Sequence, residues 1–142
     1  MSYKDNLKTG DILLFCSNFN SGIFSYFSNM IKYGSHSNYT HICMILKDPT
    51  FLDKPLKGLY VWESGFEGTP DPQDDKIKLG VQITPLDTIL DSYKDNSITI
   101  LRSINCPENT FNNKILEEIH KTVYNKPYDI VPSDWIQAFF NK

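Results

Sequence analysis

Two residues stand out because their types and positions could do chemistry. His41 begins the almost wholly apolar run 41–46, and Glu63 ends a second such run, 59–63. A histidine is costly at the start of a buried strand unless its ring is satisfied locally or a reaction takes place at that strand end. A histidine base and a carboxylate that orients it are two of the three groups of a cysteine-hydrolase site.

A structural role is the alternative for each of these residues. His41 could be a histidine satisfied within the core, which spacing alone favours, and Glu63 could be a strand-end residue facing solvent. Cys43 follows His41 by two positions, so the two side chains would share a strand face about 6.5 Å apart. That spacing is awkward for a nucleophile and its base, so Cys43 is expected to be a core residue.

Length and composition predict one globular domain in a reducing compartment. A chain of 142 residues can bury roughly 70% of its unfolded surface without a disulfide or metal. The formal charge of -3 gives no reason to expect a nucleic-acid partner. Three irregularly spaced cysteines do not make a disulfide framework. With no signal peptide or run of about 20 apolar residues, we expect an intracellular location, in the cytoplasm or a virion.

No cofactor or metal is expected from the sequence. His36, His41 and Cys43 lack the paired spacing and the fourth ligand of a zinc site. His120 falls in the longest predicted helix, and we expect it to be solvated.

Hydrophobic periodicity and turn residues predict an α+β fold, in which helices pack on a mainly antiparallel sheet. Strands are expected at 11–16, 41–46, 59–63, 80–84 and 97–102, and helices at 21–33, 85–93, 111–124 and 134–141. The strand 41–46 is expected to be covered on both faces. Residues 65–76, rich in Gly, Pro and Asp, are expected to form an exposed excursion.

Two of the predicted helices carry apolar stripes. The stripe of helix 111–124 comprises Ile115, Leu116, Ile119 and Val123. The stripe of helix 21–33 is expected to face the core. It could instead contact a membrane, although it lacks the basic face of an interfacial helix.

Several short motifs follow one another in a recognisable order. They are Gly-Asp-Ile-Leu-Leu-Phe at 10–15, Tyr-Thr-His-Ile-Cys-Met-Ile at 39–45 and Val-Trp-Glu-Ser at 61–64, followed by matching segments at 81–86, 98–102, 126–129 and 133–136. This order resembles the circularly permuted branch of the NlpC-type papain-like cysteine hydrolases of bacteria and large DNA viruses, a relative of the lecithin:retinol acyltransferase group. The resemblance covers nearly the whole chain and implies one permuted papain-like domain over residues 1–142.

The resemblance implies that His41 is the catalytic base and that Glu63 orients its ring. Tyr39 would line the site, and Cys16 would be the best substitute nucleophile within the chain. The family places its nucleophilic cysteine in a helix after the Asp-Trp-Ile segment, here residues 134–136, whereas no cysteine follows Cys106. We therefore expect a domain that is incomplete at its C-terminus, with the nucleophile beyond Lys142 and little activity in this chain alone.

The resulting hypothesis is a cysteine-dependent hydrolase or acyltransferase, such as a thiol protease or amidase. It would act on an amide, ester or thioester bond of an acyl or peptide-like substrate. The alternatives left open are a natural non-catalytic member, namely a binding or virion-associated module that retains the fold, and takeover by one of the chain's own cysteines. A C-terminal fragment or a second copy in a homodimer would cover the apolar pair Phe139 and Phe140.

Overall fold

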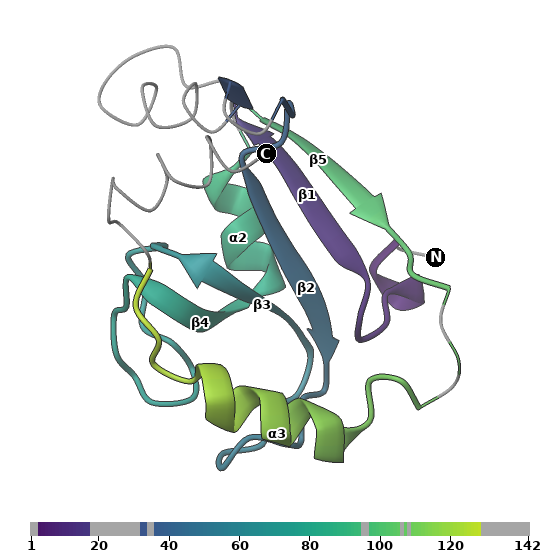
Figure 1. Cartoon of the computed structure of the whole chain (residues 1–142), viewed down its shortest axis with the longest axis vertical. Helices are drawn as coiled ribbons and strands as arrows, with labels where there is room; N and C mark the ends of the chain where they lie inside the picture. Colours follow the sequence, from purple (N-terminus) through teal and green to yellow (C-terminus); the bar gives the residue numbers. More distant parts are fainter. Residues whose placement is uncertain are drawn as a thin grey trace.

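The computed structural model shows an open antiparallel sheet with a helix on each face (Figure 1). The structure describes residues 3–17, 32–33, 36–94, 97–105, 107 and 109–128. Along the chain the elements are η1 (Tyr3–Asn6), β1 (Ile12–Ser17), β2 (His41–Lys47), β3 (Leu59–Gly65), β4 (Gly80–Pro85), α2 (Leu86–Ser92), β5 (Ser97–Arg102) and α3 (Asn113–Val123). The five strands are ordered β4-β3-β2-β1-β5. The α+β class and the antiparallel sheet are thus confirmed.

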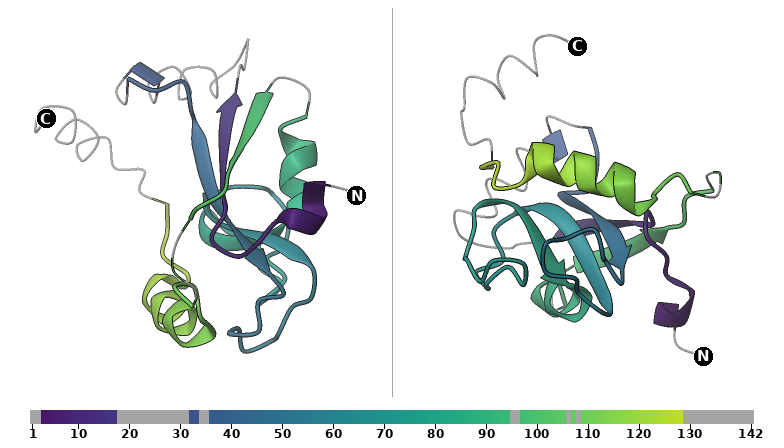
Figure 2. Two further views of the ribbon diagram at one scale, coloured as in Figure 1. Left: turned by 90° about the vertical axis from the view of Figure 1, so that its right-hand side faces the viewer. Right: turned by 90° about the horizontal axis from the view of Figure 1, so that it is seen from below.

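The core consists of two clusters, one on each face of the sheet. Side chains alternate between the faces along each strand, so odd and even positions of β2 enter different clusters. The α2 cluster comprises Leu7, Leu13, Phe15, Cys43, Ile45, Val61, Leu86 and Ile89. The α3 cluster comprises Leu46, Phe51, Leu52, Ile83 and Leu116. Figure 2 shows the two helices on opposite sides of the sheet, which is why the central strands are apolar at nearly every position.

The strand register brings His41 and Glu63 onto the same face. Met44 of β2 lies opposite Trp62 of β3, and Phe15 of β1 lies opposite His41. Because side chains alternate along each strand, this register places the odd-numbered side chains of β1, β2 and β3 on the α2 face. His41 begins β2 and Glu63 stands near the end of β3, so both lie toward one end of the sheet.

The predicted strands, and the predicted helices that became α2 and α3, agree with the structure to within two residues at each end. Asn112 begins α3 with a side-chain cap, because its Oδ1 accepts a hydrogen bond from the Ile115 N–H at 3.1 Å. The helix predicted at 21–33 lies outside the described residues except for 32 and 33, which are helical. The helix predicted at 134–141, with its two phenylalanines, also lies outside them.

Two sequence expectations about burial are wrong. Residues 65–76 were expected to be exposed, but Asp71 is 1% exposed. It is buried because its carboxylate accepts a hydrogen bond from the backbone N–H of Ile83 in β4 at 3.1 Å. The strand 41–46 was expected to be covered on both faces, but Ile42 is 58% exposed. Ile42 lies two residues nearer the start of β2 than Met44, which packs on the α3 cluster.

No helix within the described ranges combines the length and the apolar character needed to cross a bilayer.

Candidate active site

Backbone contacts with β1 fix the position of His41. The N–H of Thr40 donates to the carbonyl of Phe15 at 2.8 Å, and the Thr40 hydroxyl donates to the same oxygen at 3.2 Å. Phe15 in turn lies opposite His41 in the ladder. The chain therefore enters β2 in one defined register, and the His41 side chain keeps 14% of its surface exposed.

His41 and Glu63 make a short polar contact. Nε2 of His41 lies 2.6 Å from Oε2 of Glu63, whose side chain is fully buried. The other carboxylate oxygen accepts a hydrogen bond from the Thr84 hydroxyl of β4 at 2.5 Å. A carboxylate only accepts, so Nε2 carries the hydrogen and Nδ1 of the neutral ring has the lone pair. Among the described residues, nothing forms a hydrogen bond with that Nδ1.

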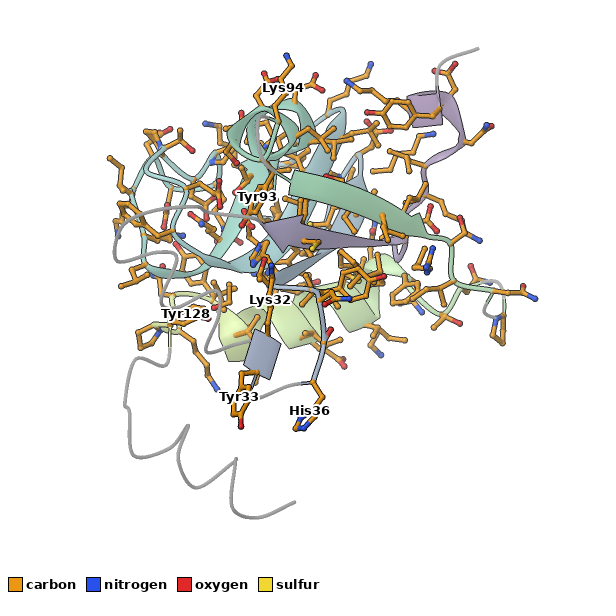
Figure 3. All side chains as sticks on the ribbon, turned by 90° about the horizontal axis from the view of Figure 1, so that it is seen from above. Lys32, Tyr33, His36, Tyr93, Lys94 and Tyr128 are labelled. Atoms are coloured by element: carbon orange, nitrogen blue, oxygen red, sulfur yellow. The ribbon has the colours of Figure 1, made fainter. Side chains whose placement is uncertain are left out.

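Two aromatic rings hold the plane of the imidazole. The Tyr93 ring is nearly parallel to it, at 7° with centroids 5.9 Å apart, and Phe15 packs against both rings. Tyr93 follows α2 as its C-cap, where its N–H donates to the carbonyl of Ile89. Burial, then the negative charges of Glu67 and Glu63, raise the pKa of Tyr93, so its phenol is neutral. Figure 3 views this end of the sheet, with Tyr93 labelled.

Glu67 and Gly65 complete the surroundings of the ring. A Cβ atom placed on Gly65 would lie 3.4 Å from Cε1 of His41, 3.9 Å from Oε2 of Glu63 and 4.0 Å from Oε1 of Glu67. Glu67 Oε2 accepts a hydrogen bond from the Ser92 hydroxyl at 3.0 Å. Burial, followed by the charge of Glu63, raises the pKa of Glu67, while Ser92 and His41 lower it. No sequence pattern distinguishes this second carboxylate within its Gly- and Pro-rich segment, so it was not predicted.

The described cysteines do not offer an activated thiol beside His41. Cys43 shares the face of His41, but it is 3% exposed. Burial, then the charges of Glu63 and Glu67, raise the pKa of the Cys43 thiol and keep it protonated. Cys16 follows Phe15, so strand alternation places it on the opposite face of the sheet from His41. Cys106 lies outside the described residues.

Tyr39 is half-buried and precedes β2, with its N–H donating to the Ser37 hydroxyl at 3.1 Å. Within the described part of the chain, His41 makes ring contacts with Phe15 and Tyr93 and none with Tyr39. The described residues also contain no group of three or more His, Cys, Asp or Glu side chains arranged to hold a metal ion.

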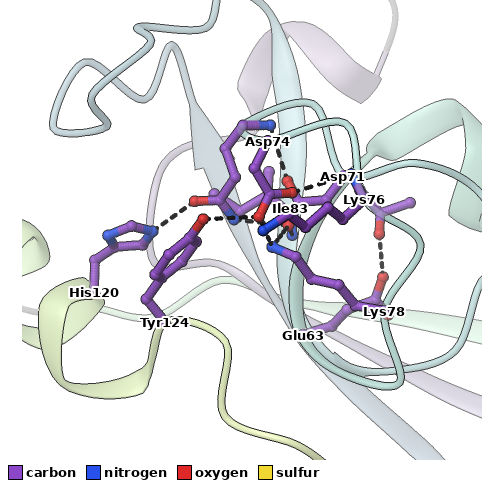
Figure 4. A network of polar contacts seen from close by, with 10 residues as sticks. Glu63, Asp71, Asp74, Lys76, Lys78, Ile83, His120 and Tyr124 are labelled. Atoms are coloured by element: carbon purple, nitrogen blue, oxygen red, sulfur yellow. Dashed lines mark hydrogen bonds and ion pairs between the residues drawn. The ribbon is translucent and has the colours of Figure 1, made fainter.

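A separate polar network ties the segment before β4 to α3 (Figure 4). Lys78 pairs with Asp71 at 2.8 Å and with Asp74 at 2.9 Å. His120 Nε2 lies 2.7 Å from Oε1 of Gln73, so this nitrogen donates. Three rings surround the imidazole: Phe51, Trp62 and Tyr124. The expectation that His120 is solvated is therefore wrong, and burial lowers its pKa.

Comparisons with known proteins leave the family open. No protein-family model matches the chain, and no curated protein matches it. The permuted papain-like assignment from motif order stays a prediction.

Proposed function

We propose that this chain carries the base and the orienting carboxylate of a cysteine-dependent hydrolase or acyltransferase with a permuted papain-like fold. The substrate would be an acyl or peptide-like compound with an amide, ester or thioester bond. The observation that carries the proposal is the 2.6 Å contact between His41 Nε2 and a carboxylate with no exposed surface.

The geometry suits a base better than a purely structural histidine. Glu63 is itself held by Thr84, so the carboxylate and the imidazole it contacts have defined orientations. A satisfied structural ring would use both nitrogens, whereas nothing in the described residues bonds to Nδ1. The ring also stands at a strand end and is partly exposed.

In the proposed reaction, Nδ1 of His41 accepts the proton of a cysteine thiol and the thiolate attacks the carbonyl carbon. The resulting oxyanion collapses to a thioester as the imidazolium gives its proton to the departing amine, alcohol or thiol. Water or an acceptor nucleophile then cleaves the thioester, with His41 again moving the proton. Glu63 keeps the ring in the Nε2–H tautomer and stabilises the imidazolium.

The attacking thiol is proposed to lie beyond Lys142, as the motif order of the family predicts. Neither described cysteine supports a different assignment. The Cys43 thiol is buried and held protonated, and Cys16 is on the other face of the sheet.

The proposal is tested by labelling the full-length protein, with any residues that follow Lys142, with a thiol-reactive acyl probe. We expect labelling at a cysteine outside residues 1–142. The His41→Gln variant should lose it, and Glu63→Gln should slow it by about 10²-fold or more. The matched controls are His36→Gln and Glu118→Gln, which change exposed residues of the same types and should label at the wild-type rate.

Folding of each variant is checked by circular dichroism before labelling. A folded full-length protein that stays unlabelled would overturn the proposal. Labelling that proceeds equally fast without the His41 imidazole would overturn it as well, because the base would then have no role.

A non-catalytic binding or virion-associated module is the second candidate. Cys43 favours it, since the described thiol nearest His41 along the strand is buried and protonated. This candidate predicts that a folded His41→Ala protein keeps its cellular function. Loss of that function in a stable His41→Ala protein would argue against it.

A further inference from the structure

Glu67 lies beside the His41–Glu63 pair without sharing its hydrogen bonds. Oε1 of Glu67 and Cε1 of the His41 ring both lie within 4.0 Å of one point, which is where a Cβ atom would stand if residue 65 were not glycine. Gly65 has no side chain, so no Cβ atom occupies this point. Ser92, the last residue of α2, anchors the other carboxylate oxygen at 3.0 Å.

We propose that Glu67 is a positioning residue whose negative charge stabilises the imidazolium of His41 once the base has taken up its proton. This inference rests on the proposed function, because only a base that becomes charged during the reaction needs a second carboxylate. It extends that function by assigning a role to a residue that makes no direct bond to the base.

The electrostatic interaction between Glu67 and His41 is reciprocal. The charge of His41 lowers the pKa of Glu67, so the ionised carboxylate must favour the charged ring by the same interaction free energy. Glu67 is nonetheless in an unfavourable place for a carboxylate, because burial and the neighbouring Glu63 raise its pKa. None of the ion pairs among the described residues includes Glu67.

Other titratable groups near the ring do not supply this charge. Cys43, on β2, and Tyr93, at the end of α2, both have raised pKa values and are neutral. Tyr128, which follows α3, acts on Tyr93 only as a minor electrostatic influence. Among the described groups around His41, this leaves Glu63 on β3 and Glu67 just after it as the two carboxylates.

The test is a pH titration of the His41 Cε1–H resonance by NMR in protein labelled with ¹³C-histidine. The resonance is assigned by its loss in a His41→Gln variant. In Glu67→Gln, which keeps the shape and the acceptor for Ser92, we expect the titration midpoint of His41 to fall below that of the wild-type protein. In Ser92→Ala the pKa of Glu67 should rise further, so a smaller shift in the same direction is expected.

Glu118→Gln is the matched control, because it removes the same charge from an exposed position on α3 and should leave the His41 midpoint unchanged. A Glu67→Gln protein that is folded and titrates at the wild-type midpoint would overturn the inference. So would an equal shift in the Glu118→Gln control, since the effect would then come from net charge alone.

The two proposals can fail separately. The titration needs no nucleophile or substrate. A shift of the His41 midpoint without any thiol labelling would therefore support the coupling between Glu67 and His41 and rule out the proposed hydrolase function. If labelling depends on His41 but the His41 midpoint is unchanged in Glu67→Gln, the hydrolase proposal stands and the role of Glu67 is ruled out.

Discussion

Truncating Glu63 to alanine should destabilise the fold substantially. The Nε2–H of His41 and the hydroxyl of Thr84 would both lose their acceptor at a side chain with no exposed surface. Each polar group left unsatisfied in such a place costs about 1–3 kcal/mol, and the cavity adds about 1 kcal/mol. Relief from burying the carboxylate charge offsets part of this, so we expect a loss of about 2–5 kcal/mol in the free energy of unfolding.

Glutamine at the same position separates shape from charge. Its carbonyl oxygen can accept from His41 while its amide donates to the Thr84 oxygen, so both contacts seen in the structure persist. The expected loss is therefore only about 0–1.5 kcal/mol. A domain of this size has about 5–15 kcal/mol of stability in total, so the two variants are distinguishable.

Urea unfolding at pH 7.5, followed by far-UV circular dichroism, measures both losses and shows through the m-value whether unfolding stays two-state. The exposed Glu118→Ala variant controls for losing a carboxylate. If Glu63→Ala were as stable as this control, the buried contacts described here would not hold the ring. If Glu63→Gln lost as much stability as Glu63→Ala, charge rather than hydrogen-bond geometry would organise the site.

Two further perturbations test the packing of the fold away from the His41–Glu63 contact. Gly80→Ala should cost about 3 kcal/mol of unfolding free energy in thermal or urea denaturation, because its φ is +150° and the new Cβ would lie 2.3 Å from the Lys126 carbonyl. Gly58→Ala, with φ +113° and only an ordinary contact at 4.0 Å from the Tyr60 ring, should cost only about 1 kcal/mol, and equal losses would contradict this packing. For His120, burial lowers the folded-state pKa, so below about pH 6.5 the unfolded chain binds a proton that the folded chain resists, and stability falls as the pH drops. In His120→Gln the decline in stability between about pH 7.5 and 5 should be shallower, and an unchanged slope would contradict the assigned burial.

The sheet was predictable because its pattern is local and redundant. Runs such as 41–46 and 59–63 are bounded by turn residues, and an apolar side chain at nearly every position indicates helices on both faces. The rotation of α3 was harder to predict. The stripe drawn from the sequence included Ile115 and Ile119, which are 40% and 46% exposed, while Leu116 and the ring of His120 face the sheet. A half-buried histidine that bonds to Gln73, 47 residues away, leaves no local signal.

Some residues of the candidate site were likewise predictable from the sequence and others were not. Motif order suggested His41 with Glu63, and the register between β2 and β3 brings them into contact. Glu67 and Tyr93 approach the ring from a loop and from the end of a helix, whose paths depend on tertiary contacts. Asp71 was missed for a similar reason, since the partners that permit its burial come from later in the chain.

The chain that follows α3 returns to the outer side of β4. Pro127 forms an antiparallel bridge with Gly80, the Val81 N–H donates to the Lys126 carbonyl, and the Tyr128 N–H donates to the carbonyl of Leu79. These bonds occupy backbone groups that an unpaired border strand would otherwise offer to a neighbour, and a proline cannot donate to an added strand. Self-association by sheet extension is thus obstructed on the border of the sheet nearer Glu63.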